Sequence, residues 1–304
     1  MLSQEPVFHR YVALGDSFTE GVGDPDPTRP NGLRGWADRV AEELATRSAD
    51  FGYANLAVRG RLLGPIVDEQ IDAAVALEPD LVTIYAGGND FMRPKIDIDV
   101  LVARYDEAIG KLAATGAEVL VWTAYDAGWA AVFGKLRGRS AIYNELVREV
   151  ADRHGARIVD FWRFDEYRDL RMWDWDRLHM STPGHQNMAI RVLQTLGVEH
   201  HIVMDPLGPE LPTDRASQRE ADRRWRREFL VPWVGRRLRG TSSGDGITAK
   251  RPRSHRSGRG RRPTREGRPG IPAGPLSSAV RQSVPRLRVE AIATRPIRPT
   301  RAKA

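Results

Sequence analysis

The sequence contains no cysteine, which excludes disulfide bonds, thiolate metal sites and a cysteine nucleophile. It also lacks any run that approaches the roughly 20 apolar residues needed to cross a bilayer. Residues 1–6 have neither the basic start nor the apolar core of a secretory signal. We therefore expect a cytoplasmic protein with no transmembrane segment.

Aromatic side chains are absent from residues 241–304, which are instead rich in proline, glycine and arginine. Such a segment buries too little apolar surface to offset the entropy lost on ordering, so we predict a disordered basic tail. This tail holds 16 Lys or Arg residues against three Asp or Glu residues, whereas the whole chain has a net charge of +7. The pI near 9.9 therefore reflects the tail, and it does not indicate specific binding of nucleic acid.

Residues 1–200 alternate short apolar runs with helical patterns, which is typical of an α/β domain. The expected strands are short and rich in β-branched or aromatic residues, at 8–14, 53–57, 81–86, 119–123 and 157–160. Apolar residues three to four positions apart predict helices between them. Ser181, Thr182 and Pro183 predict the start of a last helix that would run from about Gly184 to Leu196. The pattern predicts a parallel sheet with helices on both faces.

A helical extension is expected over residues 201–240. Thr213 or Asp214 can cap a helix that runs to Leu230, before Pro232 interrupts it. Among many arginines, this segment has an apolar side made by Trp225, Phe229, Leu230, Trp233, Val234 and Leu238. We favour a helix packed on the domain's own surface, and the alternative is contact with a membrane surface or a partner helix through residues 213–240. The sequence does not indicate the oligomeric state.

A serine follows the first expected strand, in the sequence Gly15-Asp16-Ser17. Because open α/β folds place their chemistry at the carboxyl ends of strands, Ser17 is a candidate nucleophile. A serine hydroxyl is a weak nucleophile unless a base removes its proton, so a histidine is also required. The alternative is a plain turn or helix cap, in which the same residue types are common.

His179 is the favoured base among the seven histidines. Asp176 lies three residues earlier and can accept the Nδ1 proton of the ring, which would fix the tautomer. The alternative is a loop histidine beside an acidic, tryptophan-rich stretch. His185 is the nearest competitor, but it falls inside the last expected helix with no carboxylate at a similar offset, so we expect a structural role for it.

Two further segments offer hydrogen-bond donors for an oxyanion. Asn89 follows the third expected strand, and its side-chain amide is a donor of the required kind. Gly60 follows the second expected strand and offers its backbone N–H. Both residues also suit ordinary turns, since asparagine is common there and glycine readily adopts positive φ.

These segments resemble the four sequence blocks of the SGNH, or GDSL-type, hydrolase superfamily over residues 8–196. The matching residues, in block order, are Ser17, Gly60, Asn89 and the pair Asp176 and His179. The resemblance implies a flavodoxin-like, three-layer α/β fold with about five parallel strands. It also implies a catalytic triad of Ser17, Asp176 and His179, and an oxyanion hole formed by Ser17, Gly60 and Asn89. Ester hydrolysis without a metal or another cofactor would follow.

The predicted function is hydrolysis of a small-molecule carboxylic ester through an acyl-enzyme on Ser17. An acyltransferase that uses the same triad is the alternative within enzymes. A binding protein that acts through the basic C-terminal region is the alternative outside catalysis. The natural substrate stays open between an acyl lipid, an acetylated carbohydrate and a thioester.

Overall fold

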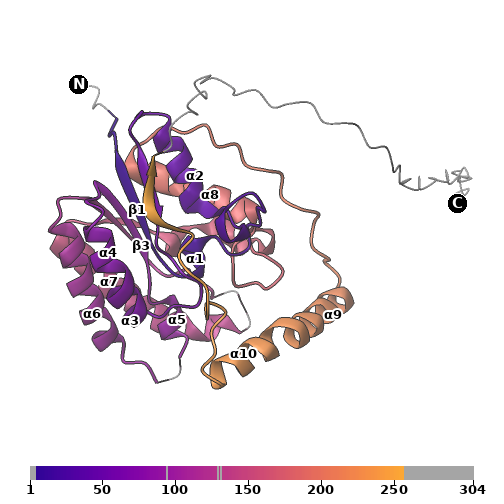
Figure 1. Ribbon diagram of the computed structural model, residues 1–304. Helices are drawn as coiled ribbons and strands as arrows, with labels where there is room; N and C mark the ends of the chain where they lie inside the picture. Colours follow the sequence, from indigo (N-terminus) through magenta and orange to yellow (C-terminus); the bar gives the residue numbers. More distant parts are fainter. Residues whose placement is uncertain (1–4, 94, 129, 131, 257–304) are drawn as a thin grey trace, which may run out of the picture. The chain divides into compact units, whose positions relative to one another are not determined.

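The computed structural model describes residues 5–93, 95–128, 130 and 132–256. Within them, six strands form a sheet in the order β5-β4-β3-β1-β2-β6 (Figure 1). The strands are β1 (Arg10–Gly15), β2 (Gly52–Asn55), β3 (Leu81–Tyr85), β4 (Glu118–Trp122), β5 (Arg157–Val159) and β6 (Arg251–Arg256). Neighbours are parallel except β2 with β6, which are antiparallel. The five parallel strands have the flavodoxin-like order, and the predicted fold class is confirmed.

The strand β1 carries apolar side chains on both faces, as expected of a buried parallel sheet. Val12 and Leu14 belong to the core on one face, whereas Tyr11 and Ala13 belong to the core on the other. This alternation has the two-residue period of a strand. All four residues are at most 2% exposed, so neither face of β1 is solvated.

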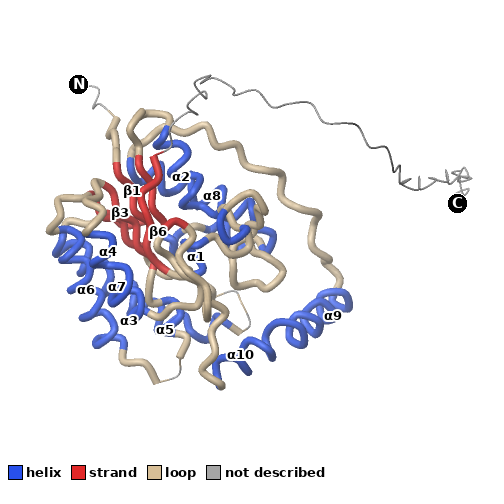
Figure 2. Tube along the Cα trace, viewed as in Figure 1, coloured by secondary structure: helices blue, strands red, loops and turns tan. Residues whose placement is uncertain are grey.

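Helices cover both faces of the sheet and give the predicted three layers (Figure 2). One face holds α6 (Ile98–Ala113), α7 (Arg137–His154) and a helix formed by α3 (Leu63–Ile66), a π-helical turn (Val67–Ile71) and α4 (Asp72–Val75). The other face holds α2 (Gly35–Ala45) and α8 (Thr182–Leu196). The helix α8 begins two residues before the expected Gly184, because Ser181 caps it and Pro183 lies in its first turn, and it ends at Leu196 as predicted.

Short helices lie mainly in the loops that follow the strands. The α-helical ones are α1 (Ser17–Glu20) and α5 (Gly88–Phe91). The 3₁₀ turns are Pro30–Gly32, Phe133–Leu136, Phe161–Arg163, Asp165–Arg168 and Leu170–Met172. Because α1 and α5 directly follow β1 and β3, their first residues stand at the carboxyl edge of the sheet.

The predicted helical extension is present. The helix α9 (Arg215–Trp225) continues through a π-helical segment (Arg226–Leu230) into α10 (Val231–Leu238). The Asp214 side chain caps α9 by accepting a hydrogen bond from the Ser217 N–H at 2.8 Å. The expected end at Leu230 is wrong, because helical structure continues past Pro232 to Leu238.

Part of the apolar side of this extension packs against the rest of the described chain, as favoured from the sequence, whereas Val234 is 40% exposed. Trp225 and Phe229 are buried, and Trp225 Nε1–H donates a hydrogen bond to the Asp176 carbonyl at 2.7 Å. Contact with a membrane or a partner through residues 213–240 stays a prediction. No helix in the described part of the chain is both long and apolar enough to cross a bilayer.

The prediction of disorder from residue 241 onward is wrong for residues 241–256. They form a turn followed by β6, which pairs with the edge strand β2. Backbone hydrogen bonding in a sheet does not require aromatic side chains, which is why composition alone misses this strand. The buried Lys250 also anchors the segment, since its Nζ lies 3.1 Å from the Asp38 carboxylate. Residues 257–304 lie outside the described residues.

Candidate active site

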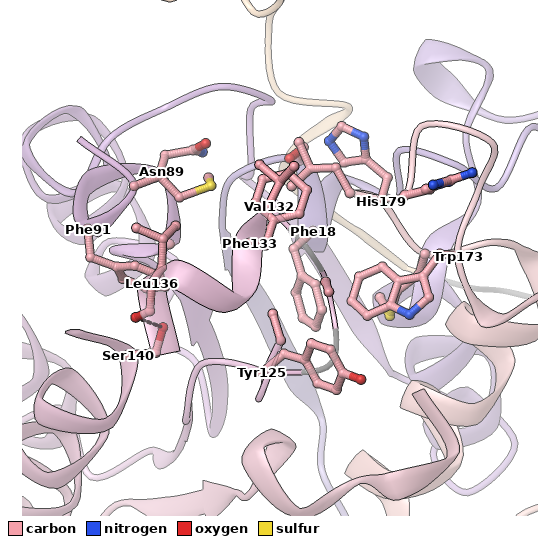
Figure 3. Close-up of a pocket in the computed structure, with 18 of the residues that line it drawn as sticks. Phe18, Asn89, Phe91, Tyr125, Val132, Phe133, Leu136, Ser140, Trp173 and His179 are labelled. Atoms are coloured by element: carbon pink, nitrogen blue, oxygen red, sulfur yellow. Dashed lines mark hydrogen bonds between the residues drawn. The ribbon is translucent and has the colours of Figure 1, made fainter. Parts of the chain in front are cut away.

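A cavity of about 350 Å³ opens at the carboxyl ends of the parallel strands. Three of the residues singled out in the sequence, Ser17, Asn89 and His179, line it. Figure 3 shows Asn89 and His179 on opposite sides of the cavity. Asp176 contacts the site through His179, whereas Gly60 is not among the described residues that form the cavity wall.

The loop between β1 and α1 places Ser17 at the cavity. Gly15 has a φ of 141°, and a side chain there would collide with the Tyr85 carbonyl. Both backbone groups of Gly15 are hydrogen-bonded to the Gln70 side chain, at 2.8 and 3.0 Å. Asp16 then caps α1 by accepting a hydrogen bond from the Phe18 N–H at 3.0 Å. Ser17 is consequently held as the first residue of α1.

His179 and Asp176 form a hydrogen-bonded pair in one tight loop. His179 Nδ1 lies 2.6 Å from Asp176 Oδ2. The other carboxylate oxygen accepts the backbone N–H groups of Leu178 and His179, each at 2.9 Å. Burial opposes ionisation of Asp176, but these hydrogen bonds outweigh it and lower the pKa of the carboxyl. Asp176 is thus an ionised acceptor that leaves Nε2 as the ring's free nitrogen.

Asn89 connects the loops that follow three strands. It lies in α5, after Gly87, which has a φ of 85°. Its Nδ2 group donates hydrogen bonds to Asp16 Oδ2 at 2.9 Å and to the Arg61 carbonyl at 3.1 Å. The Asn89 amide is therefore fixed between the loop that carries Ser17 and the loop that carries Gly60.

Asp16 is the buried partner that the sequence did not identify as a site residue. It is 3% exposed, and burial raises the pKa of its carboxyl to about 7. The hydrogen bonds from the Phe18 N–H and the Asn89 amide counteract this effect only in part. The Gly-Asp-Ser motif does place an acidic residue beside the serine, but its contact with Asn89 has no local sequence signal.

Gly60 adopts a φ of 74°, which suits glycine. A side chain at this position would collide with Ser242 Oγ, which lies in the segment that leads to β6. The neighbouring Arg61 carbonyl accepts the Asn89 amide. The loop therefore lies next to the other predicted oxyanion donor, while the role of the Gly60 N–H stays a prediction.

His185 has the structural surroundings that the sequence favoured. It is fully buried in α8, where Nδ1 accepts a hydrogen bond from the Trp36 N–H at 3.2 Å. Its Nε2–H donates to the Val22 carbonyl at 3.1 Å. Burial lowers the pKa of the ring to about 4. A neutral histidine with both nitrogens occupied is a link between segments rather than a base.

The cavity wall also includes residues that the sequence did not assign to it. Phe133, from a 3₁₀ turn, lines the cavity together with Asp222 and Trp225 of α9 and Arg226, the first residue of the π-helical segment. The helical spacing of Trp225 and Phe229 predicts an apolar helix face, but not what this face covers. Phe133 follows no motif that would have identified it.

The fold and the groups around the cavity are those of a three-layer α/β hydrolase. The chain matches the GDSL-like Lipase/Acylhydrolase family over residues 13–186 and belongs to that family. It is also 33% identical to the Bacillus subtilis (strain 168) protein YpmR over 88 residues, which are 27% of this chain. That match spans about a third of the relative's length, at 32%.

Solved structures share the fold. LAE5, an alpha/beta hydrolase enzyme from the metagenome of Lake Arreo, has a TM-score of 0.52 at 23% identity, covering 62% of this chain and 95% of LAE5. A catalytic mutant of Axe2, an acetylxylan esterase from Geobacillus stearothermophilus, has a TM-score of 0.53 at 19% identity. The match covers 63% of this chain and 95% of the Axe2 chain. At these identities the likeness shows the fold alone.

Proposed function

We propose that this protein hydrolyses small-molecule carboxylic esters through an acyl-enzyme on Ser17. The observation that carries the proposal is the 2.6 Å hydrogen bond between His179 and Asp176, with His179 and Ser17 on the wall of one cavity. The Asp176 carboxylate holds the proton on Nδ1 of His179. Nε2 then has a lone pair that can accept the proton of the Ser17 hydroxyl.

The reaction has two similar halves. In the first, Ser17 Oγ bonds to the ester carbonyl carbon while its proton passes to His179 Nε2. The tetrahedral intermediate then collapses, and the alcohol leaves with the proton from His179. In the second half, a water molecule attacks the acyl-enzyme, His179 takes the water's proton, and the acid leaves as Ser17 regains its hydrogen.

The negative charge of the intermediate needs donors near Ser17. We assign this task to the backbone N–H groups of Ser17 and Gly60 and to the Asn89 amide. The Asn89 amide donates to Asp16 and Arg61, and these two bonds fix its orientation. Because the NH₂ group has two hydrogens, donation to a substrate oxygen must replace or share one of these bonds. One such donor typically contributes about 10²–10³-fold in rate.

Labelling of the nucleophile tests the assignment of Ser17. Ser17 and Ser140 both line the cavity, so Ser140 is a matched control. Ser140 Oγ–H donates to the Leu136 carbonyl at 3.2 Å, and no acid–histidine pair is assigned to it. A fluorophosphonate probe should label the wild-type protein and the Ser140→Ala variant, but not Ser17→Ala. Mass spectrometry of the labelled peptide identifies the modified residue, and label on any residue other than Ser17 refutes the assignment.

Hydrolysis of p-nitrophenyl esters provides the second measurement. Ser17→Ala should lose the activity while its thermal unfolding stays close to that of the wild type. Adding an alcohol as an acceptor separates the two enzymatic functions, because a transferase forms a new ester and a hydrolase releases the free acid. Full activity in the Ser17→Ala variant would reject Ser17 as the nucleophile.

A further inference from the structure

The cavity extends well beyond the polar groups proposed for catalysis, and most of its wall is apolar. Phe91 and Leu136 line one side and Tyr125 and Trp173 the other, with Phe133 between them (Figure 3). The ring of Phe18, the residue that follows Ser17, stacks on Tyr85 with 4.1 Å between the ring centroids. The apolar wall therefore starts directly at the reacting serine.

One part of this wall comes from outside the family match, which ends at residue 186. Trp225 of α9 lines the cavity and is 7% exposed, and its ring contacts Phe133 edge-on, with 6.4 Å between centroids. The helix is attached to the loop of His179 by two contacts. Trp225 Nε1–H donates to the Asp176 carbonyl at 2.7 Å, and Arg177 pairs with Asp222 at 2.6 Å. The helix α9 is therefore attached to the loop of His179 and forms part of the cavity wall.

We propose that this cavity binds the acyl chain of the ester, and that Phe133 and Trp225 make the enzyme prefer medium-length acyl chains over acetyl. This inference rests on the proposed function, because it names the substrate class of the same site. A water molecule occupies about 30 Å³ of liquid, so a 350 Å³ cavity holds on the order of ten non-hydrogen atoms. An octanoyl or decanoyl chain has this size.

The chemistry of the wall favours an alkyl chain over a sugar. Away from Ser17, Asn89 and His179, two polar parts of the wall already have partners within the protein. Arg177 pairs with Asp222, and Ser140 donates to a backbone carbonyl. A sugar would leave many hydroxyl groups without partners on the aromatic wall, whereas each buried methylene of an acyl chain strengthens binding about fourfold.

The test is the chain-length dependence of kcat/KM for p-nitrophenyl acetate, butyrate, octanoate and palmitate. The wild-type enzyme should prefer octanoate. Phe133→Ala removes one wall without removing a polar contact, so the octanoate-to-acetate ratio of kcat/KM should fall by about tenfold or more. Trp225→Phe retains an aromatic wall but loses the hydrogen bond to Asp176. It should retain the preference and lower the rate for every ester alike.

Trp175→Ala is the matched control. Trp175 is 62% exposed, lies outside the described cavity wall and contacts Phe229 edge-on, so the preference should stay as in the wild type. An acetate optimum in the wild type, with the same profile in Phe133→Ala, overturns the inference and leaves the proposed function intact.

Binding to the Ser17→Ala protein separates the inference from the proposed function. Isothermal titration with decanoate should show saturable binding, which an added Phe133→Ala substitution weakens. Binding without hydrolysis of any ester supports the acyl site and rejects the catalytic proposal. Ester hydrolysis by the wild type without decanoate binding, and without a preference for octanoate, rejects the acyl site alone.

Discussion

Asp16 stands beside the proposed nucleophile and is bonded to the residue proposed to stabilise the oxyanion. One carboxylate oxygen accepts the Phe18 N–H at 3.0 Å, and the other accepts the Asn89 amide at 2.9 Å. A single buried side chain thus fixes both the start of α1 and the orientation of Asn89. We regard it as a positioning residue, because its contacts are with these two groups and the reaction proposed for Ser17 does not involve it.

Replacing Asp16 with asparagine separates these two contacts. In Asp16→Asn, Oδ1 can still accept the Phe18 N–H, but an NH₂ group then faces the NH₂ group of Asn89. Asn89 must turn away, so we expect kcat to fall toward the roughly 10²-fold loss of a missing oxyanion donor, with KM little changed. Steady-state kinetics on one ester measure kcat and KM separately. A kcat equal to that of the wild type would show that Asp16 does not position Asn89.

At the level of elements, the strand β6 and the turn before it depend on one buried ion pair. The Lys250 side chain is 0% exposed, and its Nζ lies 3.1 Å from Asp38 Oδ2 and 2.7 Å from the Arg34 carbonyl. Burial lowers the pKa of the lysine, and Asp38 counteracts this by favouring the charged form. The pair therefore fixes the chain just before β6 against α2, which carries Asp38.

Removing Lys250 should destabilise the protein more than removing an exposed lysine. Lys250→Met removes the nearest cation from the buried Asp38 carboxylate and leaves only the Arg251 guanidinium, 4.0 Å away. We therefore expect the free energy of unfolding in urea to fall by up to about 3–5 kcal/mol. The control is Lys111→Met, whose pair with Asp72 is largely exposed, and it should change little. Adding Asp38→Asn to Lys250→Met should recover part of the loss. Equal effects of the two lysine variants would contradict a structural role of the pair.

Elements differ in how far the sequence predicts them, and the difference follows from the range of the interactions. The parallel strands and the helix α8 were predicted to within about two residues at their ends, because apolar runs and the residues Ser181 to Pro183 are local signals. The strand β6 was missed, because Lys250 and Asp38 are far apart in the chain and composition does not record their pairing. The hydrogen bond between His179 and Asp176 was predicted from a spacing of three residues. The contribution of Trp225 to the cavity depends on tertiary packing alone.

At the scale of the whole molecule, two buried groups titrate in opposite senses between pH 4 and 7. Burial lowers the pKa of His185 from 6.5 to about 4, so the unfolded chain binds the extra proton and acidification destabilises the fold. Burial raises the pKa of Asp16 from 3.8 to about 7, so the folded chain binds the extra proton and acidification stabilises it. At 1.36 kcal/mol per pKa unit, the two effects are about 3 and about 4 kcal/mol. They nearly cancel.

Single substitutions should therefore expose each effect between pH 7 and pH 4. His185→Gln removes the histidine, so its free energy of unfolding should rise on acidification as Asp16 binds a proton in the folded state. Asp16→Asn removes the acid and leaves His185, so the free energy of unfolding of this variant should fall as the pH drops from about 6.5 to about 4. Urea unfolding at a series of pH values measures both slopes. Parallel curves for the three proteins would mean that neither group titrates differently in the folded and unfolded chains. Slopes of opposite sign for the two variants are expected, because the fold buries a base, His185, in α8 and an acid, Asp16, beside Ser17.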